Sequence, residues 1–180
     1  QQQFAIVKAT EGISYVNPHY QEDSTSMRAA GLIRGTYHYA LPQYSAILQT
    51  QHYAAVLATN TTSLDLPPAL DLEETGGLSP AALQIWVRAF LTTLDKLTGR
   101  QTIIYVSPGF WRYQMGNTTE FSERPLWIAD YNGGTSPTMP LPGGWTKWTF
   151  WQYTGNGSVD GVATPIDLNT FNGSLSLIHI

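Results

Sequence analysis

Residues 68–99, PALDLEETGGLSPAALQIWVRAFLTTLDKLTG, contain the clearest structural pattern in the chain. The segment PALDLE at 68–73 is typical of a strand that ends in acids, and a glycine turn follows it. Ser79 can cap a helix, Pro80 suits its first turn, and Gly99 can end it. Between these signals one apolar stripe recurs at helical spacing: Leu83, Trp86, Val87, Phe90, Leu91, Leu94 and Leu97. A strand followed by a one-sided helix is the repeating unit of parallel sheets.

The same alternation precedes this stretch. FAIVKAT at 4–10 is a short apolar run that suits a strand buried on both faces. Asn17 and Pro18 can start a helix that runs to Ala30 and ends at Gly31. Residues 32–40 then predict a second strand, and residues 44–58 predict a second helix.

Helices become scarce after Gly99. Residues 102–106 predict a strand, and a short helical piece follows around residues 110–115. Three further apolar runs, at 126–131, 148–153 and 162–168, are separated by Gly- and Pro-rich turns that leave no room for helices. This order predicts an α/β fold, an irregular and incomplete TIM-like β/α barrel with helices mainly in its first half. An open doubly wound sheet is the alternative, and it would need helices in the second half.

Length and composition suggest one secreted domain. The 180 residues are 42% apolar, enough for one core, and no polar linker divides them. A net charge of -4 gives no basic surface for nucleic acid, and no apolar run is long enough to span a membrane. Four Asn-X-Ser/Thr sequons, at Asn60, Asn117, Asn156 and Asn172, agree with secretion, although a chain rich in Asn, Ser and Thr also makes them by chance. We expect an extracellular monomer.

Asp71 and Glu73 are the candidate catalytic residues. Residues two apart in a strand point to the same face, and these two lie where the strand ends. In parallel barrels that end carries the chemistry. Repulsion between two neighbouring carboxylates raises the pKa of one, and cleavage of a glycosidic bond needs a proton donor beside an ionised partner. An isolated Asp-X-Glu is more often a strand end that meets solvent, so its surroundings must decide.

Aromatic and acidic side chains recur where the expected strands end. Rings can cover the apolar face of a sugar while phenol and indole groups hydrogen-bond to it, which suits an uncharged polysaccharide. The aromatic set is Tyr37, Tyr39, Tyr105, Trp127, Tyr131, Trp151 and Tyr153. Asp130 and Asp167 end two further strands, and in a barrel these ends converge.

Other chemistries have little support. His19, His52 and His179 stand alone with no metal-ligand spacing, so we expect no metal and no cofactor. His38 lies between two tyrosines, where a hydrogen-bonded structural role is favoured. There is no Gly-X-Ser-X-Gly elbow, no phosphate-binding glycine loop and no cysteine.

Several segments, taken in order, resemble one known family. They are FAIVKATEG at 4–12, GLIRGTYHYA at 31–40, PPALDLE at 67–73, PLWIADY at 125–131, WQY at 151–153 and IDLNTFNG at 166–173. This set is similar to glycoside hydrolase family 25, the Chalaropsis-type lysozymes, over nearly the whole chain. The resemblance implies an irregular β/α barrel and an N-acetylmuramidase that cleaves the β-1,4 bond after N-acetylmuramic acid in peptidoglycan.

The resemblance also implies roles for individual residues. Glu73 matches the family's general acid, and Asp71 matches the carboxylate that supports the reacting sugar. We favour assistance by the substrate's own acetamido group, with Asp71 orienting it, over a covalent intermediate. Asp167 and Tyr39 match positions that line the pocket.

One departure from the family pattern affects the expected fold. Members usually begin with a strand that carries a further active-site Asp, whereas only three glutamines precede the second family motif here. We therefore expect the domain, residues 1–180, to lack the family's first strand, and to be fully active only if another segment fills the gap. Two alternatives stay open: a wall-binding relative without turnover, and a chitin-type hydrolase, which the Pro at 67 and the Ala at 69 disfavour.

Overall fold

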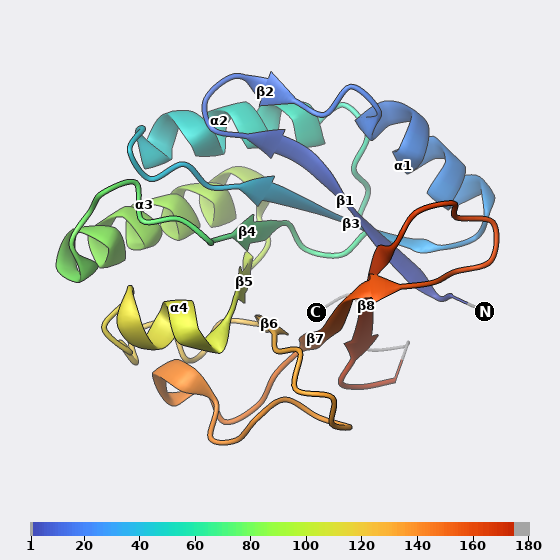
Figure 1. Ribbon diagram of the computed structural model, residues 1–180. Coiled ribbons are helices and arrows are strands. Elements are labelled where there is room, and N and C mark those ends of the chain that lie inside the picture. Colours follow the sequence, from blue (N-terminus) through green and yellow to red (C-terminus); the bar gives the residue numbers. More distant parts are fainter. Residues whose placement is uncertain (1, 175–180) are drawn as a thin grey trace.

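The computed structural model describes residues 2–174, which form one curled sheet with the helices packed against its outer side (Figure 1). The strands within this range are β1 (Phe4–Glu11), β2 (Tyr15–Val16), β3 (Ile33–Tyr39), β4 (Ala69–Asp71), β5 (Ile103–Val106), β6 (Leu126–Ala129), β7 (Phe150–Gly157) and β8 (Ile166–Phe171). Their order in the sheet is β2-β1-β3-β4-β5-β6-β7-β8. The prediction of an incomplete TIM-like barrel is confirmed.

The sheet is parallel in its centre and antiparallel at its two edges. Strands β1 and β3 to β7 pair in parallel, as the alternation of strands and helices predicted. Strand β8 instead pairs antiparallel with β7, because the segment between them contains no crossover helix. Strand β2, which the sequence analysis missed, forms a short antiparallel pair with β1. Within the described residues β1 and β8 do not pair, so the barrel is open between them.

The helices are α1 (Tyr20–Ala29), α2 (Ala46–Leu57), α3 (Pro80–Thr98) and the short α4 (Pro108–Tyr113), with a 3-10 turn η1 (Pro142–Gly144). Helix α3 confirms its predicted signals, since the Ser79 side chain accepts a hydrogen bond from the Ala82 amide and Gly99 has φ of 68°. Its stripe is buried from Leu83 to Leu94, but Leu97 is 51% exposed.

Helix α1 begins later than predicted. The sequence favoured Asn17 as its N-cap, whereas the helix starts at Tyr20. Asn17 is used differently: its side chain accepts from the His19 amide and donates to the Lys8 carbonyl, which ties the start of the helix to β1. A competing side-chain to backbone hydrogen bond therefore moved the helix start.

Two apolar clusters lie on opposite faces of the sheet. The larger one packs the helices against the outer face and includes Leu70, Phe90 and Ile104. The smaller one fills the inside of the curl and includes Ala69, Ile103 and Phe150. Alternate residues of each strand supply the two clusters. The inner cluster therefore lies beneath the inward-facing side chains at the ends of the strands.

His38 confirms the structural role predicted for it. The ring is fully buried against the helices, with Nδ1 2.7 Å from the Thr10 hydroxyl and Nε2 2.9 Å from the Gln49 side-chain oxygen. Burial lowers the pKa of His38 to about 4, so the ring stays neutral near neutral pH.

A β-bulge interrupts β1 after Lys8. Lys8 pairs with Tyr37, but Thr10 pairs with His38, so Ala9 is an extra residue in the ladder. The bulge leaves both Ala9 and Thr10 fully buried. It also brings Glu11, which pairs with Tyr39, to the same inner face as Lys8.

Candidate active site

Asp71 is the last residue of β4 and lies in the middle of the sheet. Its register partners are Tyr39 on β3 and Tyr105 on β5. The side chain points inward, above Ala69 of the inner cluster, and only 6% of the residue is exposed. Its Oδ1 atom is buried and has no hydrogen-bond partner among the described residues. A buried carboxyl oxygen without a partner is costly, and such groups concentrate at functional sites.

Several effects act on the pKa of Asp71. Burial has the largest effect and raises the pKa, and the neighbouring Glu73 carboxylate raises it further. Lys8 opposes both, while Asp167 adds a smaller increase. Together they raise the pKa of Asp71 to about 9, so Asp71 keeps a proton at neutral pH. The expected shift in one member of the acid pair therefore falls on the buried Asp71.

Glu73 follows the end of β4 and is exposed to solvent. Burial raises the pKa of Tyr37, Tyr39, Tyr105 and Tyr131, and the charge of Glu73 raises all four further. The next residue, Glu74, has a different contact, because its Oε1 accepts a hydrogen bond of 2.9 Å from the Tyr39 hydroxyl. The two adjacent glutamates thus occupy different positions at the mouth of the curl.

Lys8 is a cation beside the acids. Its ammonium forms an ion pair with Glu11 and lies over two aromatic rings, 4.8 Å from the centroid of Tyr39 and 5.5 Å from that of Tyr15. These contacts fix the amine, and its charge favours the ionised form of Asp71.

Gln152 joins two tyrosines across the site. Its Oε1 accepts hydrogen bonds from Tyr105 at 2.8 Å and from Tyr131 at 2.5 Å. Gln152 lies on β7 and is 3% exposed, whereas Tyr105 lies on β5 and Tyr131 follows β6. One buried amide oxygen therefore sets the positions of two phenols that come from different parts of the sheet.

A groove of about 390 Å³ runs along the opening between β1 and β8. Trp127 lies in its inner wall, where its ring packs edge-on against Tyr105 at 4.7 Å and its indole N–H donates to Asn169 at 2.7 Å. Tyr37, Gln152 and Asp167 also line the groove. This volume falls in the range of small-molecule sites.

Asp167 and Tyr131 approach each other over Gly155. A Cβ atom at Gly155 would lie 3.3 Å from Asp167 Oδ1 and 3.4 Å from the Tyr131 hydroxyl. The glycine thus leaves room for both groups at the rim of the site. Tyr131 is 58% exposed, and its hydroxyl is held by Gln152, which lines the groove.

Two residues that the sequence placed in the site lie elsewhere. Trp151 is 4% exposed within the outer cluster, and its indole N–H donates to the Asp130 carbonyl. The Asp130 carboxylate accepts from the Thr138 amide and from Asn132, so it organises the loop after β6. The structure places both outside the groove for one reason: the side chains alternate along each strand, and on β6 and β7 the inward residues are Trp127 and Gln152.

Three residues of the site, Lys8, Gln152 and Asn169, were not predicted. All three lie within segments that carry the family resemblance, but they belong to no paired acids and are not aromatic rings. Gln152 faces inward because Trp127 pairs with Phe150, two residues before Gln152, and this register cannot be read from the sequence. Lys8 reaches the inner face by the regular alternation of β1, whereas its ion-pair partner Glu11 depends on the bulge, which the sequence does not signal.

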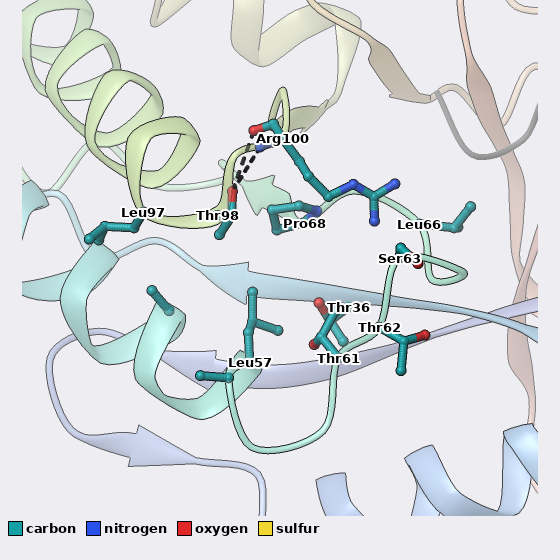
Figure 2. Close-up of a pocket in the computed structure, with 12 residues that line it drawn as sticks. Thr36, Leu57, Thr61, Thr62, Ser63, Leu66, Pro68, Leu97, Thr98 and Arg100 are labelled. Atoms are coloured by element: carbon teal, nitrogen blue, oxygen red, sulfur yellow. Dashed lines mark hydrogen bonds between the residues drawn. The ribbon is translucent and has the colours of Figure 1, made fainter.

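A second cavity, of about 420 Å³, lies away from the acids (Figure 2). It is bounded by the C-terminal ends of α2 and α3 and by the loop that leads to β4, with Leu57, Leu97 and Arg100 among its lining residues. No Asp or Glu lines this cavity. It therefore lacks the groups that acid-base chemistry on a sugar requires.

Across residues 2–174 no group of three or more His, Cys, Asp and Glu side chains is arranged to hold a metal ion. Of the isolated histidines, His19 is exposed and His52 bonds to the Tyr15 carbonyl, while His179 lies outside the described residues. No helix within this range is both long and apolar enough to cross a membrane.

The structure is an open β/α barrel with an acid pair at the end of a central strand, and phenols and an indole surround the pair. These features are typical of carbohydrate-active β/α-barrel proteins. Residues 2–162 match the family model for glycosyl hydrolases family 25, and the chain belongs to this family.

Known relatives agree with this assignment. The chain is 36% identical over 173 residues to the YegX protein of Escherichia coli K12, covering 96% of this chain and 60% of YegX. It is 34% identical over 184 residues to the N,O-diacetylmuramidase of Chalaropsis sp, covering 96% of this chain and 84% of that protein. The crystal structure of a bacterial lysozyme from Streptomyces coelicolor superposes with a TM-score of 0.87 at 33% identity, over 98% of this chain and 84% of the other.

Proposed function

We propose that this chain is the catalytic domain of a secreted peptidoglycan N-acetylmuramidase. It hydrolyses the β-1,4 bond between N-acetylmuramic acid and N-acetylglucosamine and acts as a monomer without a cofactor. The observation that carries this proposal is the pairing of a buried Asp71, in register with Tyr39 and Tyr105, with an exposed Glu73 at the same strand end. Relatives named as a lysozyme and a muramidase support the substrate class.

The different burial of the two acids supports a different role for each in the reaction. Glu73, which reaches solvent, protonates the oxygen of the departing sugar. Asp71 supplies the proton that the pair shares and, once ionised, orients and stabilises the acetamido group of the reacting sugar. Lys8 favours the ionised form of Asp71 at that stage. Water then opens the acetamido intermediate, and Glu73 accepts its proton.

The aromatic wall supports the binding of the glycan. Tyr37, Tyr105 and Trp127 present ring edges and faces next to the acids. Tyr39 and Tyr131, with Asp167, stand closer to the rim. Such a wall can cover the apolar face of a sugar ring while the polar tips bond to its hydroxyl groups.

Glu73→Gln tests the assignment, and Glu74→Gln is its matched control. Both substitutions remove one exposed negative charge at neighbouring positions. We expect Glu73→Gln to lower the release of reducing ends from peptidoglycan by about 10²–10⁴-fold, the usual contribution of a general acid. Glu74→Gln should retain most activity, because it changes only the contact with Tyr39. Equal activity of the two variants would defeat the assignment of Glu73.

A wall-binding function without turnover is the second candidate. The open edge between β1 and β8 favours it, because the described residues place no strand between these two that could carry the additional active-site Asp of the family. This function predicts that the protein sediments with cell walls yet releases no reducing ends from them. Measured turnover by the unmodified chain would exclude it.

A further inference from the structure

The tripeptide Asn-Thr-Thr occurs twice, at 60–62 and at 117–119, and both copies fit the acceptor sequence for N-linked glycans. Because the two copies are identical, their sequence gives no reason to prefer one. Their surroundings in the folded chain differ. We propose that Asn117 is a glycan attachment site and that Asn60 is a structural residue, which carries no glycan in the folded protein.

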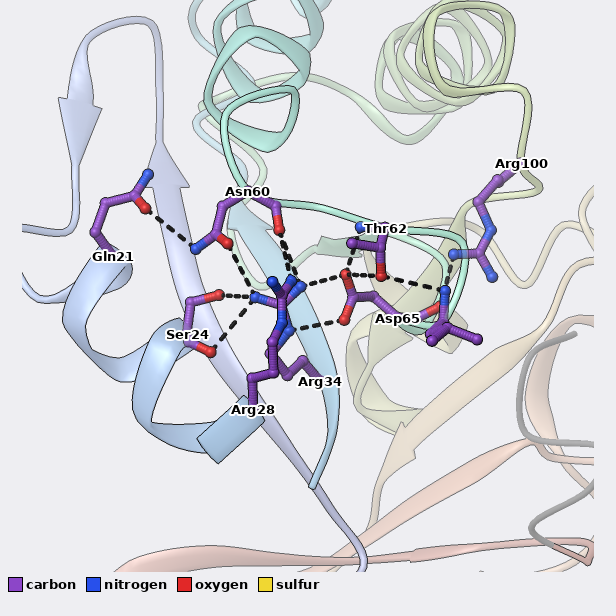
Figure 3. A network of polar contacts seen from close by, with 9 residues as sticks. Gln21, Ser24, Arg28, Arg34, Asn60, Thr62, Asp65 and Arg100 are labelled. Atoms are coloured by element: carbon purple, nitrogen blue, oxygen red, sulfur yellow. Dashed lines mark hydrogen bonds and ion pairs between the residues drawn. The ribbon is translucent and has the colours of Figure 1, made fainter. Parts of the chain in front are cut away.

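Both ends of the Asn60 amide are occupied (Figure 3). Its Oδ1 accepts from Arg34 at 3.2 Å, and its Nδ2 donates to the Gln21 side-chain oxygen at 3.1 Å. Its backbone carbonyl accepts from Arg34 at 2.9 Å and from Arg28 at 3.2 Å. The residue therefore connects α1, β3 and the loop that leads to β4.

These contacts belong to a buried ionic network. Arg34 is 4% exposed and forms an ion pair with Asp65, while Ser24 accepts from the same guanidinium. Thr62, the third residue of the tripeptide, donates to Asp65 through its amide at 2.6 Å and its hydroxyl at 3.2 Å. A glycan on Asn60 Nδ2 would take the place of Gln21 at that nitrogen, and a rotation of the amide that makes room for it would move Oδ1 away from the buried Arg34, which is strongly unfavourable.

Asn117 is held through the oxygen end of its amide, and its amide nitrogen is left without a partner among the described residues. Its Oδ1 accepts from the Gly143 backbone N–H at 2.7 Å, and no described residue bonds to its Nδ2. The residue is exposed, and its φ of 51° is one that Asn tolerates well. The Trp111 indole N–H also donates to the Thr118 carbonyl at 3.1 Å. A substituent on Asn117 Nδ2 would therefore break no hydrogen bond in the described structure.

The reaction at Asn117 is a glycosyl transfer by the secretory machinery of the producing cell. The donor is an oligosaccharide linked to a lipid pyrophosphate. A bond forms between Nδ2 and the anomeric carbon of the donor, and the bond from that carbon to the pyrophosphate oxygen breaks. The amide loses one proton, and the lipid pyrophosphate leaves with the electron pair. None of the contacts of Asn117 described above involves Asp71, Glu73 or the groove.

The test is to secrete the full chain from yeast behind a cleavable leader and to map glycans on the folded product. Enzymatic release of glycans in H₂¹⁸O marks each former attachment site as an ¹⁸O-labelled Asp, and peptide mass spectrometry locates it. We expect the label at position 117 and none at position 60. A label at 60 in the folded, secreted protein, or no label at 117, would overturn the proposal.

Thr119→Ala provides a matched control, because it removes the acceptor hydroxyl without changing Asn117 or its bond to Gly143. We expect the variant to lose the label at 117 and to melt at the same temperature as the unglycosylated wild-type chain from bacteria. Persistence of the label at 117 in this variant would contradict an ordinary N-linked site.

Discussion

The Tyr131 hydroxyl donates a 2.5 Å hydrogen bond to Oε1 of Gln152, so a ring that stands 58% exposed at the rim is tied to a buried amide. The same oxygen also holds Tyr105, next to Asp71. The geometry of the rim and of the acid pair is thus linked through one side chain. A substitution at this amide affects both.

Gln152→Leu should release both phenols. Loss of the shared acceptor leaves two partly buried hydroxyl groups without a partner, which costs about 1–3 kcal/mol of stability for each group that stays buried. We expect kcat on peptidoglycan to fall by about 10- to 100-fold, because the phenols no longer hold their positions. A Leu variant with unchanged kcat would contradict the positioning role.

Asp71→Asn should make the protein more stable at alkaline pH while lowering its activity. The pKa of Asp71 is higher in the folded chain than the usual value near 4, so folding binds a proton there. Stability from this group is therefore complete below pH 4 and is lost as pH rises toward 9. Asn has no such proton to lose. We expect equal unfolding free energies at pH 4 and a higher value for the variant at pH 8, measured by denaturant titration; a lower value at pH 8 would be inconsistent with a protonated Asp71.

Lys8→Met should move the alkaline limb of the activity profile to higher pH. The Lys8 charge lowers the pKa of Asp71, so its removal raises that pKa. The ion pair with Glu11 is partly exposed, and we expect its loss to cost less than about 1 kcal/mol. The measurement is kcat/KM against pH for both proteins. A shift of this limb to lower pH would show that Lys8 acts in another way.

His38→Gln should reduce the sensitivity of the fold to acid. The pKa of His38 is about 4 in the folded chain, below the ordinary histidine value of 6.5, so the unfolded chain binds more protons between these values. Stability therefore falls as pH drops from 6.5 toward 4. Gln retains hydrogen-bonding groups but does not titrate. We expect the difference in unfolding free energy between pH 7 and pH 4 to be smaller in the variant, and an equal difference would assign the acid sensitivity to other groups.

The two arginine ion pairs should respond very differently to substitution. Arg34→Met leaves Asp65 charged and buried, which should cost about 3–5 kcal/mol. Arg88 pairs with Glu120 on the surface of α3, and Arg88→Met should leave the melting temperature unchanged. Thermal melts of the two variants make the comparison. A similar drop in melting temperature in both variants would show that burial does not determine how much each ion pair contributes to stability.

The sequence predicted the barrel because its signals are local and agree with one another. The strand at 68–73, the caps at Ser79 and Gly99 and the apolar stripe between them all describe one β/α unit, and the structure contains that unit. The helix-poor second half was also predicted correctly. The helix start near Asn17 was wrong because a side-chain hydrogen bond to Lys8 redirects that segment.

The site was predicted in outline and missed in detail. Acids and rings at strand ends can be read from the sequence, but which of two adjacent residues faces inward depends on register. Trp151 and Gln152 are neighbours, and only Gln152 reaches the groove. The assignment of the proton to Asp71 likewise depends on burial, which is a property of the assembled sheet.

The extra residue in β1 lets the two faces of the sheet be filled separately on either side of the bulge. Because Ala9 and Thr10 both turn toward the helices, the strand resumes its alternation with Glu11 beside Lys8. A chain shortened by Ala9 alone would keep Thr10 opposite His38 and Glu11 opposite Tyr39. The cost would fall on the packing of the helical layer, while Lys8 and Glu11 would keep their places on the inner face. A change at Ala9 can therefore alter the packing of the helical layer without moving the charged side chains of the cleft.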